Sequence, residues 1–147
     1  MSDQVRAEQQ IAWELHVELV TRIATVTLPE REGLLDEALS SLAAMADAFR
    51  QILHGYQPNP DRSSVGHQVE VVADTVLARI VDPFVLRWQP QLAGWLADRP
   101  VDVGKPDHER SWPKAVALRT DLAGVQARLR PLAEQLAELA DAASLLR

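Results

Sequence analysis

The chain has 147 residues, a formal net charge of −6 and no cysteine. This length suits a single domain, residues 1–147, that buries one continuous core. The lack of cysteine excludes disulfides, thiolate metal sites and cysteine nucleophiles, and the negative charge opposes sequence-independent binding to nucleic acid.

Targeting signals are not evident in the sequence. No N-terminal stretch joins a basic flank to an apolar signal region, and no apolar run approaches the roughly 20 residues that span a bilayer. We therefore expect a cytoplasmic protein that does not enter the membrane.

The first 56 residues contain two helical patterns. One covers residues 3–27, with Ala12, Leu15 and Leu19 on a single face. The next begins at Pro29, since proline is tolerated in a first helical turn, and runs to Tyr56. Its apolar face repeats at steps of three and four: Leu35, Ala38, Leu42, Met45, Phe49, Ile52 and Tyr56. The short connection predicts an antiparallel hairpin.

Residues 57–66 are rich in proline, serine and asparagine and predict a loop, in which Ser63 or Ser64 caps the next helix. The third helical pattern then extends to Trp95. Pro83 and Pro90 interrupt this pattern. Because a proline costs about 3 kcal/mol in a regular helix interior, we expect a kink or a split there.

The last part of the chain carries the longest helical pattern. Residues 98–110 predict a loop, and Ser111 with Trp112 and Pro113 predicts a cap and first turn. Pro131 lies off the apolar face and predicts only a mild bend. The apolar positions are Leu118, Leu122, Val125, Leu129, Leu132, Leu136, Leu139, Ala143 and Leu146. Such a heptad pattern is typical of a helix that packs on other helices, or on a second copy.

These patterns together predict an all-α fold. The simplest arrangement that buries every apolar face is an antiparallel up-down four-helix bundle, with a third helix that proline kinks or splits.

Catalytic and metal-binding motifs are missing from the sequence. No Glu-x-x-His pair, G-x-S-x-G motif or glycine-rich phosphate loop is present, so we expect neither an enzyme, nor a cofactor, nor a metal site. His16 shares the apolar face of its helix and is expected to be buried with its polar atoms satisfied. Asp107, His108 and Glu109 are expected in a solvated loop or a helix cap.

Residues 83–100 are the most unusual segment, because broken helical geometry coincides with tryptophan and arginine. One interpretation is that the tryptophans fill one end of the bundle. The other is that they anchor a protein partner, since tryptophan and arginine dominate interface energetics. The candidate partner-binding residues are Arg87, Trp88, Leu92, Trp95 and Leu96.

Four segments resemble small, mostly uncharacterised all-helical proteins of actinobacteria: WELHVELVTRIA (13–24), GLLDEALSSL (33–42) with FRQILHGYQP (49–58), VLARIVDPFVLRWQPQLAGW (76–95) and HERSWPKAVALRTDLAGVQARL (108–129). Some such proteins belong to bacterial conflict or antiviral systems, in which small helical modules accompany nucleases, proteases or NTPases. The resemblance implies an accessory or adaptor role and assigns no functional residues.

The leading hypothesis is a non-catalytic interaction or adaptor module that binds another protein or forms a homodimer. A second hypothesis is a helical bundle that binds a small ligand or a metal through His16, Glu14, Glu18 or His108. A third is a helical DNA-binding regulator that uses Arg119, Arg128 and Arg130.

Overall fold

The computed structural model describes residues 2–26 and 35–146, and all regular structure in these ranges is helical. The elements are α1 (Asp3–Val26), α2 (Leu35–His54), α3 (Ser64–Asp74), the π-helical segment η1 (Thr75–Val81), α4 (Asp82–Ala97), α5 (Lys105–Arg110) and α6 (Ala115–Leu139). The all-α prediction is thus confirmed. The expected helix start at Pro29 lies outside the described residues.

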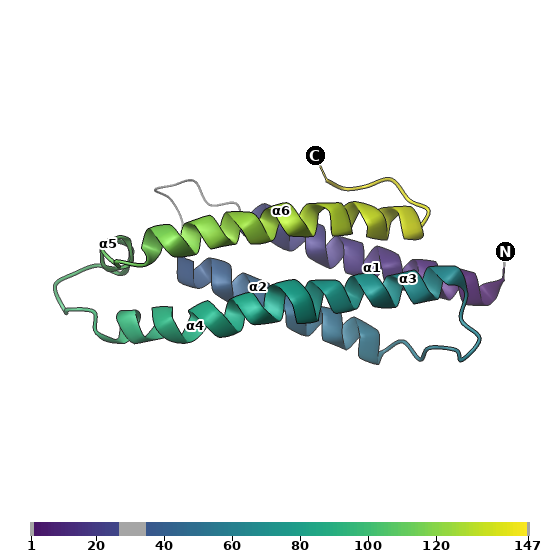
Figure 1. The fold of residues 1–147 in the computed structure, drawn as a ribbon, viewed down its shortest axis with the longest axis horizontal. Helices are drawn as coiled ribbons and strands as arrows, with labels where there is room; N and C mark the ends of the chain where they lie inside the picture. The colour runs from purple at the N-terminus through teal and green to yellow at the C-terminus, as the bar shows by residue number, and fades with distance from the viewer. Residues whose placement is uncertain (1, 27–34, 147) are drawn as a thin grey trace.

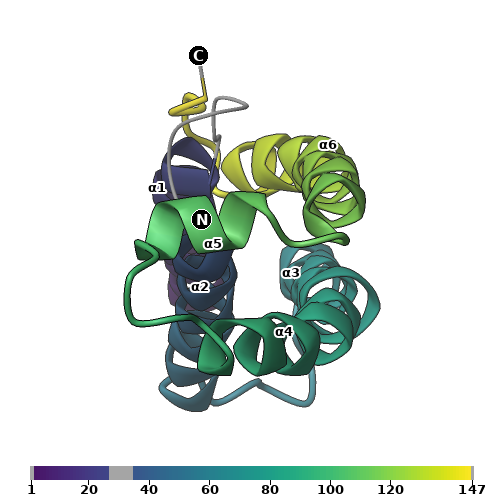
Figure 2. The same ribbon diagram turned by 90° about the vertical axis from the view of Figure 1, so that its left-hand side faces the viewer.

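The long helices lie side by side along the longest axis of the molecule (Figure 1). Helix α1 packs against α6, α2 and α3, while α2 packs against α4, and α6 against α3 and η1. The short helix α5 lies across one end of this arrangement (Figure 2). Among the described helices, none is long and apolar enough to cross a membrane.

The apolar face predicted for α2 forms a large part of the core. Leu35, Leu42 and Phe49 are almost inaccessible to solvent, and Ile52 is half-buried at the end of the same face. From α1, Leu15 and Leu19 meet this face in one continuous cluster. Each such side chain contributes roughly 1.5–3 kcal/mol of transfer free energy, so the core needs no disulfide or metal.

Helix α6 follows the predicted pattern at first and then departs from it. Leu118, Leu122 and Leu129 are buried as expected, but at the next position Ala133 is inaccessible and Leu132 only half-buried. A straight helix of 3.6 residues per turn drifts by about 20° per heptad relative to a seven-residue repeat. This drift brings the small side chain of Ala133 to the centre of the core.

Neither Pro83 nor Pro90 interrupts the helical structure, which continues from Ser64 to Ala97, so the expected split does not occur, while the expected kink stays a prediction. The chain instead widens into the π-helical segment η1 just before Pro83. Pro83 has no N–H to offer the Arg79 carbonyl of the preceding turn. The guanidinium of Arg128 on α6 donates to this carbonyl oxygen at 3.4 Å. A side chain of a neighbouring helix therefore reaches the carbonyl to which proline cannot donate.

Two further boundaries differ from the prediction. The expected loop at residues 98–110 contains helix α5, and α6 begins at Ala115 rather than at the Ser111 cap. Helix α6 ends at Leu139, so the last apolar positions of the pattern, Ala143 and Leu146, are not helical. Pro131 lies within α6 and does not end it, as expected.

A tight turn ends α6. Asp141 has a left-handed backbone (φ 55°), its N–H donates to the Glu138 carbonyl, and the Ala142 N–H donates to the Ala137 carbonyl. These are the two hydrogen bonds of a Schellman motif, in which glycine normally holds the left-handed position. The turn sends the following residues back along α6 (Figure 1).

Replacement of Asp141 tests this turn. We expect Asp141→Gly to raise the free energy of unfolding by about 0.5–1 kcal/mol, because glycine carries no Cβ penalty in the left-handed region. Asp141→Ala keeps the Cβ but lacks the polar side chain, and is expected to lower the free energy of unfolding. Chemical denaturation of the three proteins measures the order, and equal stabilities would contradict this description of the turn.

Candidate functional site

The five candidate partner-binding residues do not share one environment. Trp88 and Leu92 are buried in the core, while Trp95 and Leu96 are half-buried against it. Only Arg87 is exposed, with 66% of its side chain accessible. In this conformation a partner that approaches α4 therefore meets Arg87 but not the buried side chains.

Trp88 instead links α4 to α6. Its indole N–H donates to Asp121 Oδ2 at 2.6 Å, and its ring meets Trp112 edge-on with 6.1 Å between centroids. The Arg87 guanidinium lies 5.0 Å from the Trp88 ring centroid and 3.7 Å from Asp121 Oδ2. Cation–π and ionic contacts therefore hold Arg87 at the surface in a defined position.

Beside Arg87, Leu86 is one of the most exposed large apolar side chains of the described residues, at 75% accessible. It borders a shallow groove of about 340 Å³ between α2 and α4. Ala43, Ala46 and Val85 supply apolar surface, and Asp47, Arg50 and Asp82 supply charge. Arg50 pairs with both aspartates. We call Leu86, Arg87 and these groove residues the Leu86 surface.

His108 is buried and holds α5 to the end of α4, so the expected solvated loop is wrong at this residue. Its ring stacks on Trp95 with 4.6 Å between centroids and 5° between planes. His108 Nε2 donates to the Trp95 carbonyl at 2.7 Å, and Trp95 Nε1 donates to the His108 carbonyl at 2.8 Å. These reciprocal bonds fix the two residues as one structural unit.

Glu109, the neighbour of His108, is also buried, with 2% of its surface accessible. It caps a helix, as the sequence allowed, but the helix is α2 rather than its own. Glu109 Oε1 accepts from the Leu35 N–H at 2.5 Å and Oε2 from the Asp36 N–H at 3.3 Å. Lys105 donates to Asp36 Oδ2 at 2.8 Å, and this hydrogen bond raises the pKa of Lys105. Helix α5 thus closes the start of α2.

Glu8, which the sequence analysis did not single out, caps the start of α3 as Glu109 caps the start of α2. It is 1% accessible, and its carboxylate accepts hydrogen bonds from the Ser63 hydroxyl, from the Ser63 N–H at 3.2 Å and from the Gly66 N–H. Gln4 donates to the same carboxylate at 3.2 Å. Burial raises the pKa of Glu8, but these bonds lower it by more, so the net pKa is below the ordinary 4.5.

A signal for Glu8 was present in the sequence. Glu8 lies four residues before Ala12 and seven before Leu15, on the apolar face of α1. An acid at such a position must find donors in the core. Its lowered pKa and fully engaged oxygens make Glu8 a poor general base and a good helix cap.

His16 is buried with both ring nitrogens bonded, as the sequence predicted. Nδ1 donates to the Ala133 carbonyl on α6 at 2.7 Å, and Nε2 accepts the Leu145 N–H at 3.1 Å. Glu14 is exposed, and Glu18 pairs with Arg22. Within the part of the chain that the structure describes, no group of three histidine or acidic side chains is placed to hold a metal ion.

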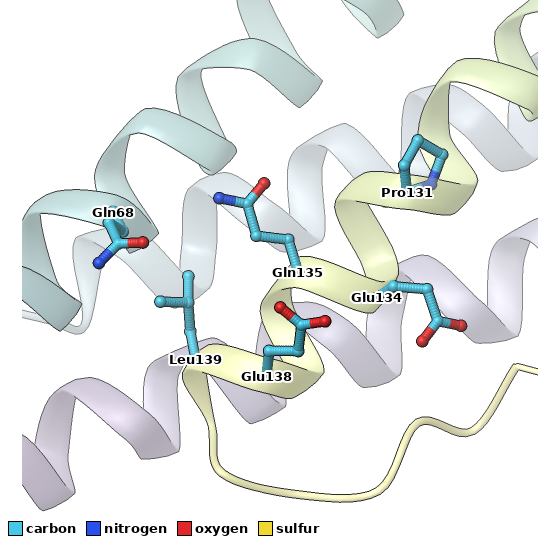
Figure 3. A pocket seen from close by; sticks show the side chains of 6 residues that line it. All are labelled: Gln68, Pro131, Glu134, Gln135, Glu138 and Leu139. Atoms are coloured by element: carbon cyan, nitrogen blue, oxygen red, sulfur yellow. The ribbon is translucent and has the colours of Figure 1, made fainter.

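The three arginines of the DNA-binding hypothesis all lie on α6. Arg128 and Arg130 are exposed and Arg119 is half-buried. The nearby hollow between α3 and α6 is lined by two acidic residues, Glu134 and Glu138, together with Gln68, Gln135, Pro131 and Leu139 (Figure 3). Acidic side chains repel phosphate, so this face offers no continuous basic patch.

The pH dependence of stability tests the Glu8 cap. Because the folded pKa of Glu8 lies below the unfolded value, its carboxylate stabilises the fold above about pH 4.5 and this stability is lost as pH falls. We expect Glu8→Gln to lower the free energy of unfolding by about 1–3 kcal/mol at neutral pH and by less in acid. The exposed Glu14→Gln serves as the control in chemical denaturation, and parallel pH profiles for wild type and Glu8→Gln would refute the cap.

A double-mutant cycle tests the close approach of Gly66. A Cβ at this position would lie 2.7 Å from Glu8 Oε1, so Gly66→Ala displaces a carboxylate that its hydrogen bonds hold in place. We expect Gly66→Ala to destabilise the wild type more than it destabilises Glu8→Ala, in which only the 3.2 Å approach to Arg62 Cβ remains and the helix preference for alanine over glycine, up to about 1 kcal/mol, opposes it. Equal changes in the free energy of unfolding in both backgrounds would show that Glu8 does not set the requirement for glycine.

Comparisons with known proteins add no functional assignment. No protein-family model, no curated protein and no solved structure matches the chain.

Proposed function

We propose that this protein is a non-catalytic helical interaction module that acts in the cytoplasm and binds another protein through the Leu86 surface. In this proposal the long helices form a four-helix bundle, and α5 is an additional short helix that packs across one end of it. A second copy of the chain is an alternative occupant of the same surface.

The exposure of Leu86 carries this proposal. Leu86 has 75% of its surface accessible on a well-packed helix. The contact of this apolar surface with water raises the free energy of the unbound protein. The groove beside Leu86 is lined by both apolar and charged side chains, as protein interfaces are. Arg87, fixed over Trp88, adds a preorganised cation at the edge.

The buried ionisable groups support an interaction role over a catalytic one. Glu8 and Glu109 cap helices, and His108 is bonded to Trp95. Since each of these groups is engaged inside the fold, they are poorly placed to transfer protons to a substrate. The resemblance to small actinobacterial helical proteins extends the proposal to an accessory component of a bacterial defence system.

A matched pair of surface variants tests this function. We expect the full-length protein to retain a protein partner from its native host, identified by mass spectrometry and then purified for binding measurements. Leu86→Glu is expected to weaken binding at least about tenfold, equivalent to about 1.4 kcal/mol, because it replaces an exposed apolar side chain at the border of the groove by a charge. Val71→Glu on α3, whose valine is 65% accessible, is the control and is expected to bind normally.

Self-association is measured on the same variants. If the second copy is the occupant, light scattering is expected to show a concentration-dependent dimer that Leu86→Glu dissociates and Val71→Glu does not. A protein that stays monomeric and retains no partner would refute the proposal, as would equal binding by the two variants.

A further inference from the structure

The segment that follows α6 is seated on the protein rather than extended into solvent. After the turn at Asp141, residues 142–146 run back along α6 (Figure 1, Figure 3). We call residues 142–146 the tail segment. Its hydrogen bonds reach two helices, since Leu145 N–H donates to His16 of α1 and Ser144 Oγ donates to Glu134 of α6 at 2.9 Å.

The His16 ring has a fixed hydrogen-bond polarity. The Ala133 carbonyl accepts only, so Nδ1 must carry the proton that it donates. In the neutral ring Nε2 is then an acceptor, and it faces a backbone N–H of the tail segment at 3.1 Å. A buried acceptor without a donor costs free energy. Whatever covers His16 must therefore offer a hydrogen-bond donor, and in this structure the donor is a backbone N–H of the tail segment.

The tail segment shows which sequence pattern this surface accepts. A hydroxyl at Ser144 reaches Glu134, a backbone N–H at Leu145 reaches His16, and the half-buried side chain of Leu146 packs against the core. The side chain of Leu145 itself is exposed. The pattern is therefore a hydroxyl residue, any residue except proline, and an apolar residue.

We propose that the surface beneath the tail segment is a docking site for an extended protein segment with this pattern, and that the tail segment occupies the site until such a partner displaces it. The inference rests on the proposed function only in that the natural ligand is a protein. It concerns a different face, because the tail segment lies beside α1 and α6, away from α4 (Figure 2).

The contacts of the tail segment suit an exchangeable occupant. Ala142, Ala143 and Leu145 are exposed, so little apolar surface is buried when the segment docks. Its advantage over a free peptide is its covalent link to α6, which supplies an effective concentration on the order of millimolar. A partner with additional contacts can exceed that advantage.

Leu145→Pro in the full-length chain opens the site, because proline has no N–H to donate to His16. The probe is a fluorescent peptide of residues 141–147 (DAASLLR), and fluorescence anisotropy measures its binding. We expect the peptide to bind the Leu145→Pro protein at least about tenfold more tightly than the wild type, in which the tail segment competes. A peptide that itself carries Leu145→Pro is the matched control and is expected not to bind.

Absence of peptide binding to the Leu145→Pro protein, or equal binding of both peptides, would overturn the inference. In the wild type, hydrogen exchange at the Leu145 amide is expected to be at least about tenfold slower than in the free peptide, and an equal rate would also overturn it. Leu86→Glu is expected to leave peptide binding unchanged. These experiments therefore distinguish refutation of the docking site under the tail segment from refutation of the Leu86 surface as a binding site.

Discussion

The structure depends on one constraint, which is that a helix that begins inside a protein must find acceptors for its first N–H groups. Here two carboxylates from other helices meet this need. Glu8 of α1 reaches the start of α3, and Glu109 of α5 reaches the start of α2. Each carboxylate also lies at the positive end of a helix dipole, which offsets the free-energy cost of its burial. Removal of either acid would leave both a buried polar end and an uncovered positive end.

These caps also determine how the helices are arranged. Apolar faces fix which sides of the helices meet but tolerate some sliding along the axis, whereas a charge-assisted hydrogen bond has a defined length and direction. Glu8 therefore fixes the position of α3 along α1, and Gly66 is the residue that lets the carboxylate approach. The reciprocal bonds of His108 and Trp95 do the same for α5 and α4. Buried polar groups in this protein thus contribute specificity of packing.

The sequence predicts the features that depend on the spacing of apolar residues. It does not predict features that depend on contacts between residues far apart in the chain. The faces of α1, α2 and the first half of α6 follow from apolar spacing, and burial of His16 follows from its place on such a face. The contact of Arg128 with the Arg79 carbonyl near Pro83 comes from α6, and no local signal predicts it. The Asp107–Glu109 stretch was expected to be solvated or a cap, because nothing in its own neighbourhood shows that Trp95 and the start of α2 lie beside it. Of the two interpretations of residues 83–100, filling of the bundle describes Trp88 and Leu92, which are buried, while Leu86 on the same helix is exposed, and the local sequence does not distinguish these sides of α4.

Among the buried ionisable side chains of the described residues, His16 differs from the others in what completes its hydrogen bonds. Glu8 and Glu109 bond to the starts of helices, and His108 to a carbonyl of α4, so their partners move only if the core opens. His16 has one such partner in Ala133, but its second is the N–H of a segment that buries little surface of its own. The free energy of that bond is retained if any other backbone N–H takes the same place. The donor to His16 Nε2 can therefore be exchanged while the helices stay folded. A site that recognises extended segments needs this property.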